Sequence, residues 1–510
     1  MQKHAMIDIG SNSIRLVVIG IDKDYFFEEL LNFKVVARLS NYIDANQNLN
    51  DEGQITLLQV LRRFLSIIHR ESGITIIDAV ATAAMRKAKN REDVMDYVYR
   101  HTGLKIRLLS GLQEAYYGFY AITNSTFMEN GISIDIGGGS TEVTMFRNRE
   151  MVHAHSFSFG AVTLYQTYFS RKDPGALAHL ESYLRETFSA FDWLTDQDLP
   201  VIGIGGAARN LCKIDQAEQH YPMVGLHQYT MPRSRLNELT GRLASMSEDA
   251  RETMDGLSKD RADIILPAAI VINMLVKLNH GKTFMLSGEG LREGVFYEWM
   301  LRERGEVRIP YVLKESIRHL RRNFNLESTH TNYVKALAFQ IFDGISPLIP
   351  GYPEAETAWL LSHSADLAYI GEYVNNESSS AHTFYLLTNI NINGISHHNR
   401  LAVALVASFK SRVKLLDFVG GSFEKFLSKS ELKMCELLGA ILRLAHDFDR
   451  TGQHVVSEVK VKSTKKKGTQ LQAFYQDDAY FEEQAAQKHK KHLERALQLP
   501  LTIQFIKNKD

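Results

Sequence analysis

Two short segments of the chain share a glycine-rich pattern in which a carboxylate precedes a polar turn. Residues 8–13 read DIGSNS and residues 135–140 read DIGGGS. Turns of this kind present backbone N–H groups that bind anions, and glycine lets the backbone approach phosphate oxygens closely. The two segments therefore predict a pair of phosphate-binding loops that hold one phosphorylated substrate between them.

An ordinary hairpin turn would explain one such segment. Two copies, each placed between two apolar strand-like runs, favour binding instead. The carboxylates that open the loops, Asp8 and Asp135, are oxygen ligands of the kind that Mg²⁺ prefers. The phosphate-binding residues predicted from these turns are Gly10, Ser11, Asn12, Ser13, Gly137, Gly138, Gly139 and Ser140.

A third segment, residues 110–115 (SGLQEA), places Glu114 in the first turn of a predicted helix. The strand predicted over residues 104–109 ends just before it, and ligands bind at the carboxyl ends of strands in such sheets. A carboxylate there can deprotonate a water molecule for attack on phosphorus. It can equally complement the helix dipole without a catalytic role, and both roles stay open on spacing alone.

Arg86 follows another predicted strand, residues 74–81. A guanidinium at this place can stabilise charge on a transferred phosphoryl group, and the alternative is an arginine on an exposed helix surface. The chain has neither a Walker A pattern nor a Gly-x-Ser-x-Gly pattern, which argues against a P-loop NTPase and a serine hydrolase.

The composition restricts the class of protein further. The 510 residues carry a formal net charge of zero, 45% are hydrophobic and two are cysteines. No global field therefore favours nucleic acid or a membrane surface as a partner, and a reducing compartment without disulfides is expected. The longest apolar stretch, residues 264–276, is too short to span a bilayer. These features predict a cytoplasmic protein.

The order of predicted elements indicates an α/β core with an internal duplication. Residues 1–124 and 125–305 each begin with strand, turn and strand and continue with alternating helices and strands. Residues 306–510 are predicted to be mostly helical, with a small sheet and a terminal helix. The predicted strands cover residues 4–9, 14–21, 33–39, 74–81, 104–109, 131–136, 142–147, 151–158, 283–286, 455–461 and 471–474, and the longer predicted helices cover residues 52–70, 91–101, 113–122, 175–191, 261–278 and 481–497.

These motifs resemble those of the exopolyphosphatase and guanosine pentaphosphate phosphatase family. The resemblance rests on residues 8–13, 82–90 (TAAMRKAKN), 110–115, 135–142 (DIGGGSTE) and 291–294 (LREG), in the family's order and spacing. It implies a duplicated actin-like, ribonuclease H-like core of the ATPase type, with Glu114 as general base and Mg²⁺ as cofactor. It also implies phosphate contacts from residues 137–141, including Thr141, and metal ligation by Asp135 and Glu142, in addition to Asp8.

The sequence departs from the family pattern at a third glycine turn, residues 203–207 (GIGGA). Ala207 stands where members often have threonine, so one hydroxyl contact is absent, while Gly205 and Gly206 remain predicted phosphate-binding residues.

Residues 306–510 resemble the HD-phosphohydrolase-like domain of long members of the family. The only adjacent His-Asp pair, His446 and Asp447, lies late in the helical pattern. Four further histidines of this region lack the expected spacing: His363, His382, His397 and His398. We therefore expect no second metal centre here. The resemblance implies a homodimer formed through this domain, while its lysines could instead line a path for a polyanion (Lys460, Lys462, Lys465, Lys466, Lys467, Lys488, Lys490 and Lys491).

The leading hypothesis is a Mg²⁺-dependent exopolyphosphatase that removes terminal phosphate from linear polyphosphate processively. A guanosine pentaphosphate phosphohydrolase with the same core is the main alternative, with guanosine penta- or tetraphosphate as partner in place of polyphosphate. A non-catalytic binder of either anion and an actin-like kinase remain as hypotheses of other classes.

Overall fold

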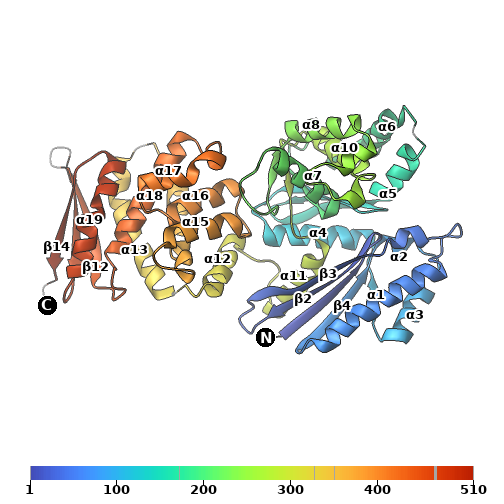
Figure 1. Ribbon diagram of the computed structural model, residues 1–510, viewed down its shortest axis with the longest axis horizontal. Helices are drawn as coiled ribbons and strands as arrows, with labels where there is room; N and C mark the ends of the chain where they lie inside the picture. The colour runs from blue at the N-terminus through green and yellow to red at the C-terminus, as the bar shows by residue number, and fades with distance from the viewer. Residues whose placement is uncertain (1, 172, 327, 350, 465–467, 509–510) are drawn as a thin grey trace. The chain divides into compact units, whose positions relative to one another are not determined.

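The structure is a computed structural model that describes residues 2–171, 173–326, 328–349, 351–464 and 468–508 (Figure 1). The chain divides into two compact units. The first unit holds residues 1–220 and 226–312, and the second holds residues 221–225 and 313–510. None of the described helices is long and apolar enough to cross a membrane.

The first sheet of the first unit has five strands in the order β3-β2-β1-β4-β5. Strand β1 is antiparallel to β2 and parallel to β4. The bounds are β1 Gln2–Ile9, β2 Ser13–Ile21, β3 Phe27–Val36, β4 Ile74–Ala81 and β5 Ile106–Leu108.

The second sheet repeats this order as β8-β7-β6-β9-β11, with β10 added at the edge. Strand β6 is antiparallel to β7 and parallel to β9, as β1 is to β2 and β4. The bounds are β6 Gly131–Ile136, β7 Thr141–Arg147, β8 Glu150–Phe157, β9 Val201–Ile204, β10 Thr230–Pro232 and β11 Thr283–Leu286. The equal strand order and direction confirm the predicted duplication of an α/β unit.

The helices of the first unit cover both sheets and begin at recognisable caps. Asn50 accepts a hydrogen bond from the backbone of Gly53 at the start of α1, and Ser110 and Gln113 form a capping box at the start of α4. The bounds are α1 Asp51–Arg70, α2 Ala83–Lys87, α3 Arg91–Thr102, α4 Gly111–Ser125, α5 Ala161–Leu164, α6 Ala176–Ser189, α7 Gly205–Glu218, α8 Arg233–Ser245, α9 Glu248–Glu252, α10 Ile265–Leu278 and α11 Leu291–Arg304.

Several predicted bounds are wrong. The strand expected over residues 33–39 runs from Phe27 to Val36, because Arg38 adopts a left-handed conformation (φ 46°) and residues Leu39–Tyr42 form a 3₁₀ turn. The helix expected over residues 261–278 begins at Ile265, after a 3₁₀ turn at Lys259–Arg261. Helix α4 runs from Gly111 to Ser125, beyond both ends of the helix expected over residues 113–122, and it buries its last turn.

The second unit is mostly helical, as expected, and buries one large apolar core. Its small sheet has the order β12-β13-β14, in which β14 was not predicted. The basic residues 465–467 lie outside the described residues. The bounds are α12 Val312–Asn323, α13 Ser328–Ile345, α14 Glu354–Leu367, α15 Ser379–Asn389, α16 His397–Ala407, α17 Arg412–Val419, α18 Lys429–Asp447, β12 Val456–Thr464, β13 Gly468–Tyr475, α19 Tyr480–Leu497 and β14 Leu501–Lys507.

Candidate active site

The two predicted loops have the same backbone geometry and approach each other within the first unit. The N–H of Gly10 donates to the carbonyl of Ser13 at 3.1 Å, and the N–H of Gly137 donates to the carbonyl of Ser140 at 2.9 Å. A Cβ added to Gly138 would lie 3.5 Å from the Cβ of Ser11. The loops therefore form two matching turns on either side of one site.

Each loop is held by the chain segment that follows it. The carbonyl of Asn12 accepts from the N–H groups of Ala37 and Arg38 at 3.1 and 2.9 Å. The carbonyls of Gly137 and Gly138 accept from the first residues of α5, and the Thr141 hydroxyl donates to the carbonyl of Phe159 at 2.8 Å. These carbonyl bonds fix the turns, so that loop N–H groups can face an anion.

Glu114 lies on the first turn of α4, and its carboxylate contacts the guanidinium of Arg86. The reciprocal capping bond of this helix comes from Gln113, so the cap does not use Glu114. Burial, then the charge of Glu142, raise the pKa of Glu114 to about 8 against the opposing effect of Arg86. A carboxylate with a pKa near neutrality is suited to accept a proton during catalysis.

Arg86 lies on α2 and connects Glu114 to the second loop. One guanidinium nitrogen donates to the carbonyl of Leu109 at 2.9 Å, and the other lies 3.5 Å from the Ser140 hydroxyl and 3.8 Å from a carboxylate oxygen of Glu142. The next residue, Lys87, donates to the carbonyl of Gly139 at 2.8 Å. The site thus has two cations beside the second loop, of which the sequence indicated Arg86 alone.

The three predicted metal ligands are carboxylates. Asp135 and Glu142 are opposite each other in the register of β6 and β7, and Glu142 accepts from the Ser156 hydroxyl at 2.7 Å. Burial, then the charges of Glu142 and Asp8, raise the pKa of Asp135 to about 7, and burial raises that of Asp8. Glu142 and Asp8 therefore lie near enough to Asp135 to raise its pKa, and carboxylate oxygens are the ligands that Mg²⁺ prefers.

The third glycine turn packs against the same carboxylates. Gly205 begins α7 in a left-handed conformation (φ 80°), and a Cβ there would lie 2.5 Å from Oδ1 of Asp135. A Cβ at Gly206 would overlap the guanidinium of Arg261. Gly205 therefore needs glycine for its backbone conformation and its close approach to Asp135, and a side chain at Gly206 would displace the guanidinium of Arg261.

Sequence reasoning missed a group of cations around Asp8 and Asp135. Burial, then the charge of Arg292, lowers the pKa values of Arg15 and Arg209, while Asp8 opposes the shift of Arg15 and Asp135 opposes that of Arg209. Only the Leu-Arg-Glu-Gly motif pointed to one of them. We call these residues the arginine cluster: Arg15, Arg209, Arg261 and Arg292, with Lys34 beside them.

A model of the Ppx/GppA phosphatase family matches residues 5–303, and a model of Ppx/GppA phosphatase, domain III matches residues 312–495. A curated relative, the bifunctional 3-dehydroquinate synthase/phosphatase of Fusobacterium nucleatum, is 25% identical over 304 residues. The match covers 56% of this chain and 44% of that relative, so the chain spans less than half of its length.

Solved structures show the same core fold. The Ppx/GppA family member of Aquifex aeolicus aligns with a TM-score of 0.54 and 24% identity, over 59% of this chain and 98% of that one. An exopolyphosphatase of Cytophaga hutchinsonii aligns with a TM-score of 0.53 and 21% identity, over 60% and 99%. The duplicated core is actin-like, the second unit is mostly helical, and the chain belongs to the Ppx/GppA phosphatase family.

Proposed function

We propose that this phosphatase is an exopolyphosphatase, a phosphoanhydride hydrolase that releases orthophosphate from the end of linear polyphosphate. The observation that carries the proposal is the contact of Glu114 with Arg86, whose second nitrogen faces Ser140 and Glu142 of a phosphate loop. A proton acceptor and a phosphate cradle are thereby joined through one cation.

Each group of residues has its own role in the proposed hydrolysis. The turns at residues 10–13 and 137–141 hold the terminal phosphate through their N–H groups. Glu114 accepts the proton of the attacking water, and Arg86 stabilises negative charge on the transferred phosphoryl group.

Mg²⁺ fits the carboxylate set. Asp8 and Asp135 would hold it, with Glu142 contributing directly or through water. Bound there, the ion neutralises charge on the phosphate. Because Glu142 already accepts from Ser156 and lies 3.8 Å from a guanidinium nitrogen of Arg86, contact with the ion through water suits it.

The arginine cluster supports a substrate that extends beyond one phosphate. The chain is neutral overall, yet these cations gather beside the two loops. A run of phosphates leaving the loops would meet them and relieve their mutual repulsion. Guanosine pentaphosphate also carries several negative charges, and the arginine cluster does not favour it over polyphosphate.

The experiment is orthophosphate release from long-chain polyphosphate by the full chain, with and without Mg²⁺. We expect release that depends on Mg²⁺. Absence of release in both conditions would contradict the proposal and favour a non-catalytic binder. A phosphorylated acceptor among the products would show a kinase.

A competition at equal concentrations of long-chain polyphosphate and guanosine pentaphosphate tests the substrate. We expect the higher kcat/KM for polyphosphate, and the reverse order would assign the enzyme to the nucleotide. A homodimer and a lysine path in the second unit stay predictions. Two of those lysines already have partners, because Lys460 pairs with Glu458 and Lys490 donates to the carbonyl of Leu501.

A further inference from the structure

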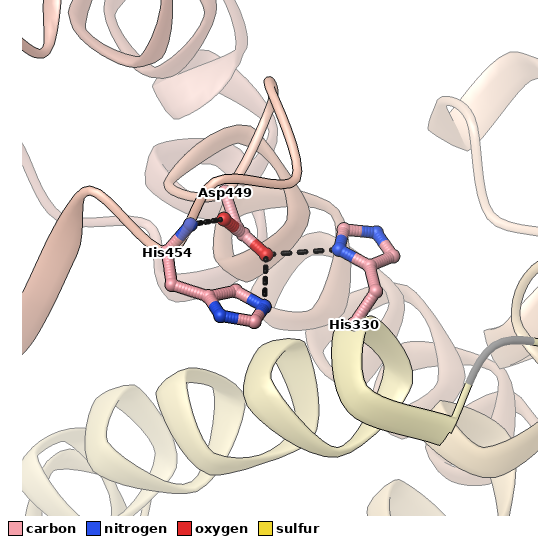
Figure 2. A group of neighbouring side chains, drawn as sticks. All are labelled: His330, Asp449 and His454. Atoms are coloured by element: carbon pink, nitrogen blue, oxygen red, sulfur yellow. Dashed lines mark hydrogen bonds and ion pairs between the residues drawn. The ribbon is translucent and has the colours of Figure 1, made fainter.

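A cluster of two histidines and one aspartate lies in the second unit, and the proposed hydrolysis does not use it. Figure 2 shows the rings of His330 and His454 on either side of the Asp449 carboxylate. One potential ligand atom of each residue lies within 4.8 Å of the others. His330 is in the first turn of α13, while Asp449 and His454 both lie in the connection between α18 and β12, so two separate segments meet here.

The carboxylate is oriented by two of its contacts. Oδ2 of Asp449 lies 2.8 Å from Nδ1 of His330, and Oδ1 accepts from the backbone N–H of His454 at 2.8 Å. Both contacts fix the direction in which Oδ2 points. Oriented ligands of this kind are a feature of metal sites.

The backbone and the ring of His454 are also held in place by neighbouring groups. Its backbone is left-handed (φ 58°), and its ring stacks on that of Tyr333 at 4.1 Å between centroids. The Tyr333 hydroxyl donates to the carbonyls of His454 and Val456. A non-glycine residue in this conformation is unfavourable unless its surroundings hold it there. Here they turn the ring toward Asp449.

Two polar groups in the cluster would gain from a shared cation. The Asp449 side chain is 0% exposed, and it forms ion pairs with His330 and His454, which are neutral unless protonated. Nε2 of His454 is buried without a hydrogen-bond partner among the described residues and lies 3.7 Å from Oδ2, too far for a hydrogen bond. A buried carboxylate and an unpartnered imidazole nitrogen both carry a cost that a shared cation removes.

We propose that His330, Asp449 and His454 bind one Zn²⁺ ion, through Nδ1, Oδ2 and Nε2 respectively. Two imidazoles and one carboxylate suit zinc, whereas Mg²⁺ prefers an all-oxygen set. The histidine side chains are 23% and 31% exposed, which leaves a path for the ion and room for water as a fourth ligand. The ion would join α13 to the α18–β12 connection and stabilise the second unit.

The test uses the metal-free full chain in excess Mg²⁺, which occupies the carboxylates of the first unit. Zn²⁺ binding is measured by calorimetry, and Co²⁺ serves as a visible-absorption probe of imidazole ligation. We expect one equivalent of Zn²⁺ and a rise in the unfolding temperature on binding. His454→Gln should weaken Zn²⁺ affinity at least about tenfold and remove the thermal effect.

His398→Gln is the matched control, because His398 is an exposed histidine of the same unit that pairs with Glu431. It should bind Zn²⁺ as the unmodified chain does. Equal Zn²⁺ affinity of His454→Gln and His398→Gln would overturn the proposal. If His454→Gln fails to fold by circular dichroism, proton NMR of the Co²⁺-loaded unmodified chain decides the question. Paramagnetically shifted resonances from two imidazoles support the site, and their absence refutes it.

Discussion

The carboxylate of Glu114 and the guanidinium of Arg86 are in direct contact, although they come from different helices, α4 and α2. Through this contact, Arg86 opposes the rise in the pKa of Glu114 that its buried position beside the second phosphate loop causes. Burial and Glu142 favour the protonated form of Glu114, and Arg86 limits that effect. The balance between them underlies the first three predictions.

Glu114→Gln keeps the shape of the side chain and removes the proton acceptor. We expect kcat to fall about 10²- to 10⁴-fold with polyphosphate binding retained, since general-base catalysis contributes about this factor. Glu52→Gln is the matched control, because Glu52 also lies in the first turn of a helix, α1. If Glu114 only complements the helix dipole, both variants will keep activity within about threefold of the unmodified chain.

Arg86→Lys keeps the charge but cannot reach Glu114 and the second loop together. We expect kcat to fall about 10²-fold, as for loss of one preorganised donor, because lysine lacks the planar fork. Arg100→Lys on α3, where Arg100 is exposed and pairs with Asp96, is the control. Full activity of Arg86→Lys in steady-state assays would show that only the charge matters.

Stability should depend on pH through Glu114. Its pKa is 4.5 in the unfolded chain and about 8 in the folded one, so the native state retains a proton that the unfolded state loses between these values. The free energy of unfolding therefore falls as pH rises from about 4.5 to about 8. Glu114→Gln removes this effect, and its stability relative to the unmodified chain should rise over that window and then level off.

Urea unfolding at a series of pH values, in the metal-free protein, measures this difference. The comparison between the two proteins cancels titrations that they share. A constant difference between their midpoints from pH 5 to pH 8.5 would contradict the raised pKa.

The local part of the site was predictable from the sequence. Residues 8–13 and 135–140 indicate turns by their own composition, and the strands beside them are short apolar runs. Both features can therefore be recognised without knowing which residues pack against them. Glu114 and Arg86 were nominated because each follows a strand whose carboxyl end lies at the site. Their roles stay predictions, since no catalytic measurement tests them.

The arginine cluster was not predictable in the same way. Arg209 is on α7, which begins at the glycine turn and was not predicted as a helix, and Arg261 is in a 3₁₀ turn. Only tertiary packing brings them to Asp135. The proposed zinc site was not predicted for the same reason. His330 and His454 come from distant segments and follow no metal-binding spacing.

Arg209→Gln tests whether the arginine cluster binds a polyanion. Each cation that contacts phosphate releases counterions, so its loss should reduce the slope of log affinity against log salt concentration by about one. We expect weaker binding of long-chain polyphosphate at low salt, with kcat changed less than KM. Arg100→Gln is the control for a surface charge. An unchanged salt slope for Arg209→Gln would place the substrate elsewhere.

Gly205→Ala should disturb the carboxylate site sterically, in addition to straining its left-handed backbone (φ 80°). The added Cβ would lie 2.5 Å from Oδ1 of Asp135, so that carboxylate must move, and a displacement of about 1 Å can cost about 10²-fold in rate. We expect lower activity and a higher Mg²⁺ concentration for half-maximal rate.

Gly103→Ala separates this effect from backbone strain. Gly103 is also left-handed (φ 69°) but has no atom within 4 Å of its Cβ position, so alanine there should cost about 1–2 kcal/mol of stability and leave the Mg²⁺ requirement unchanged. Equal Mg²⁺ requirements in the two variants, measured by orthophosphate release, would show that Asp135 does not hold the ion.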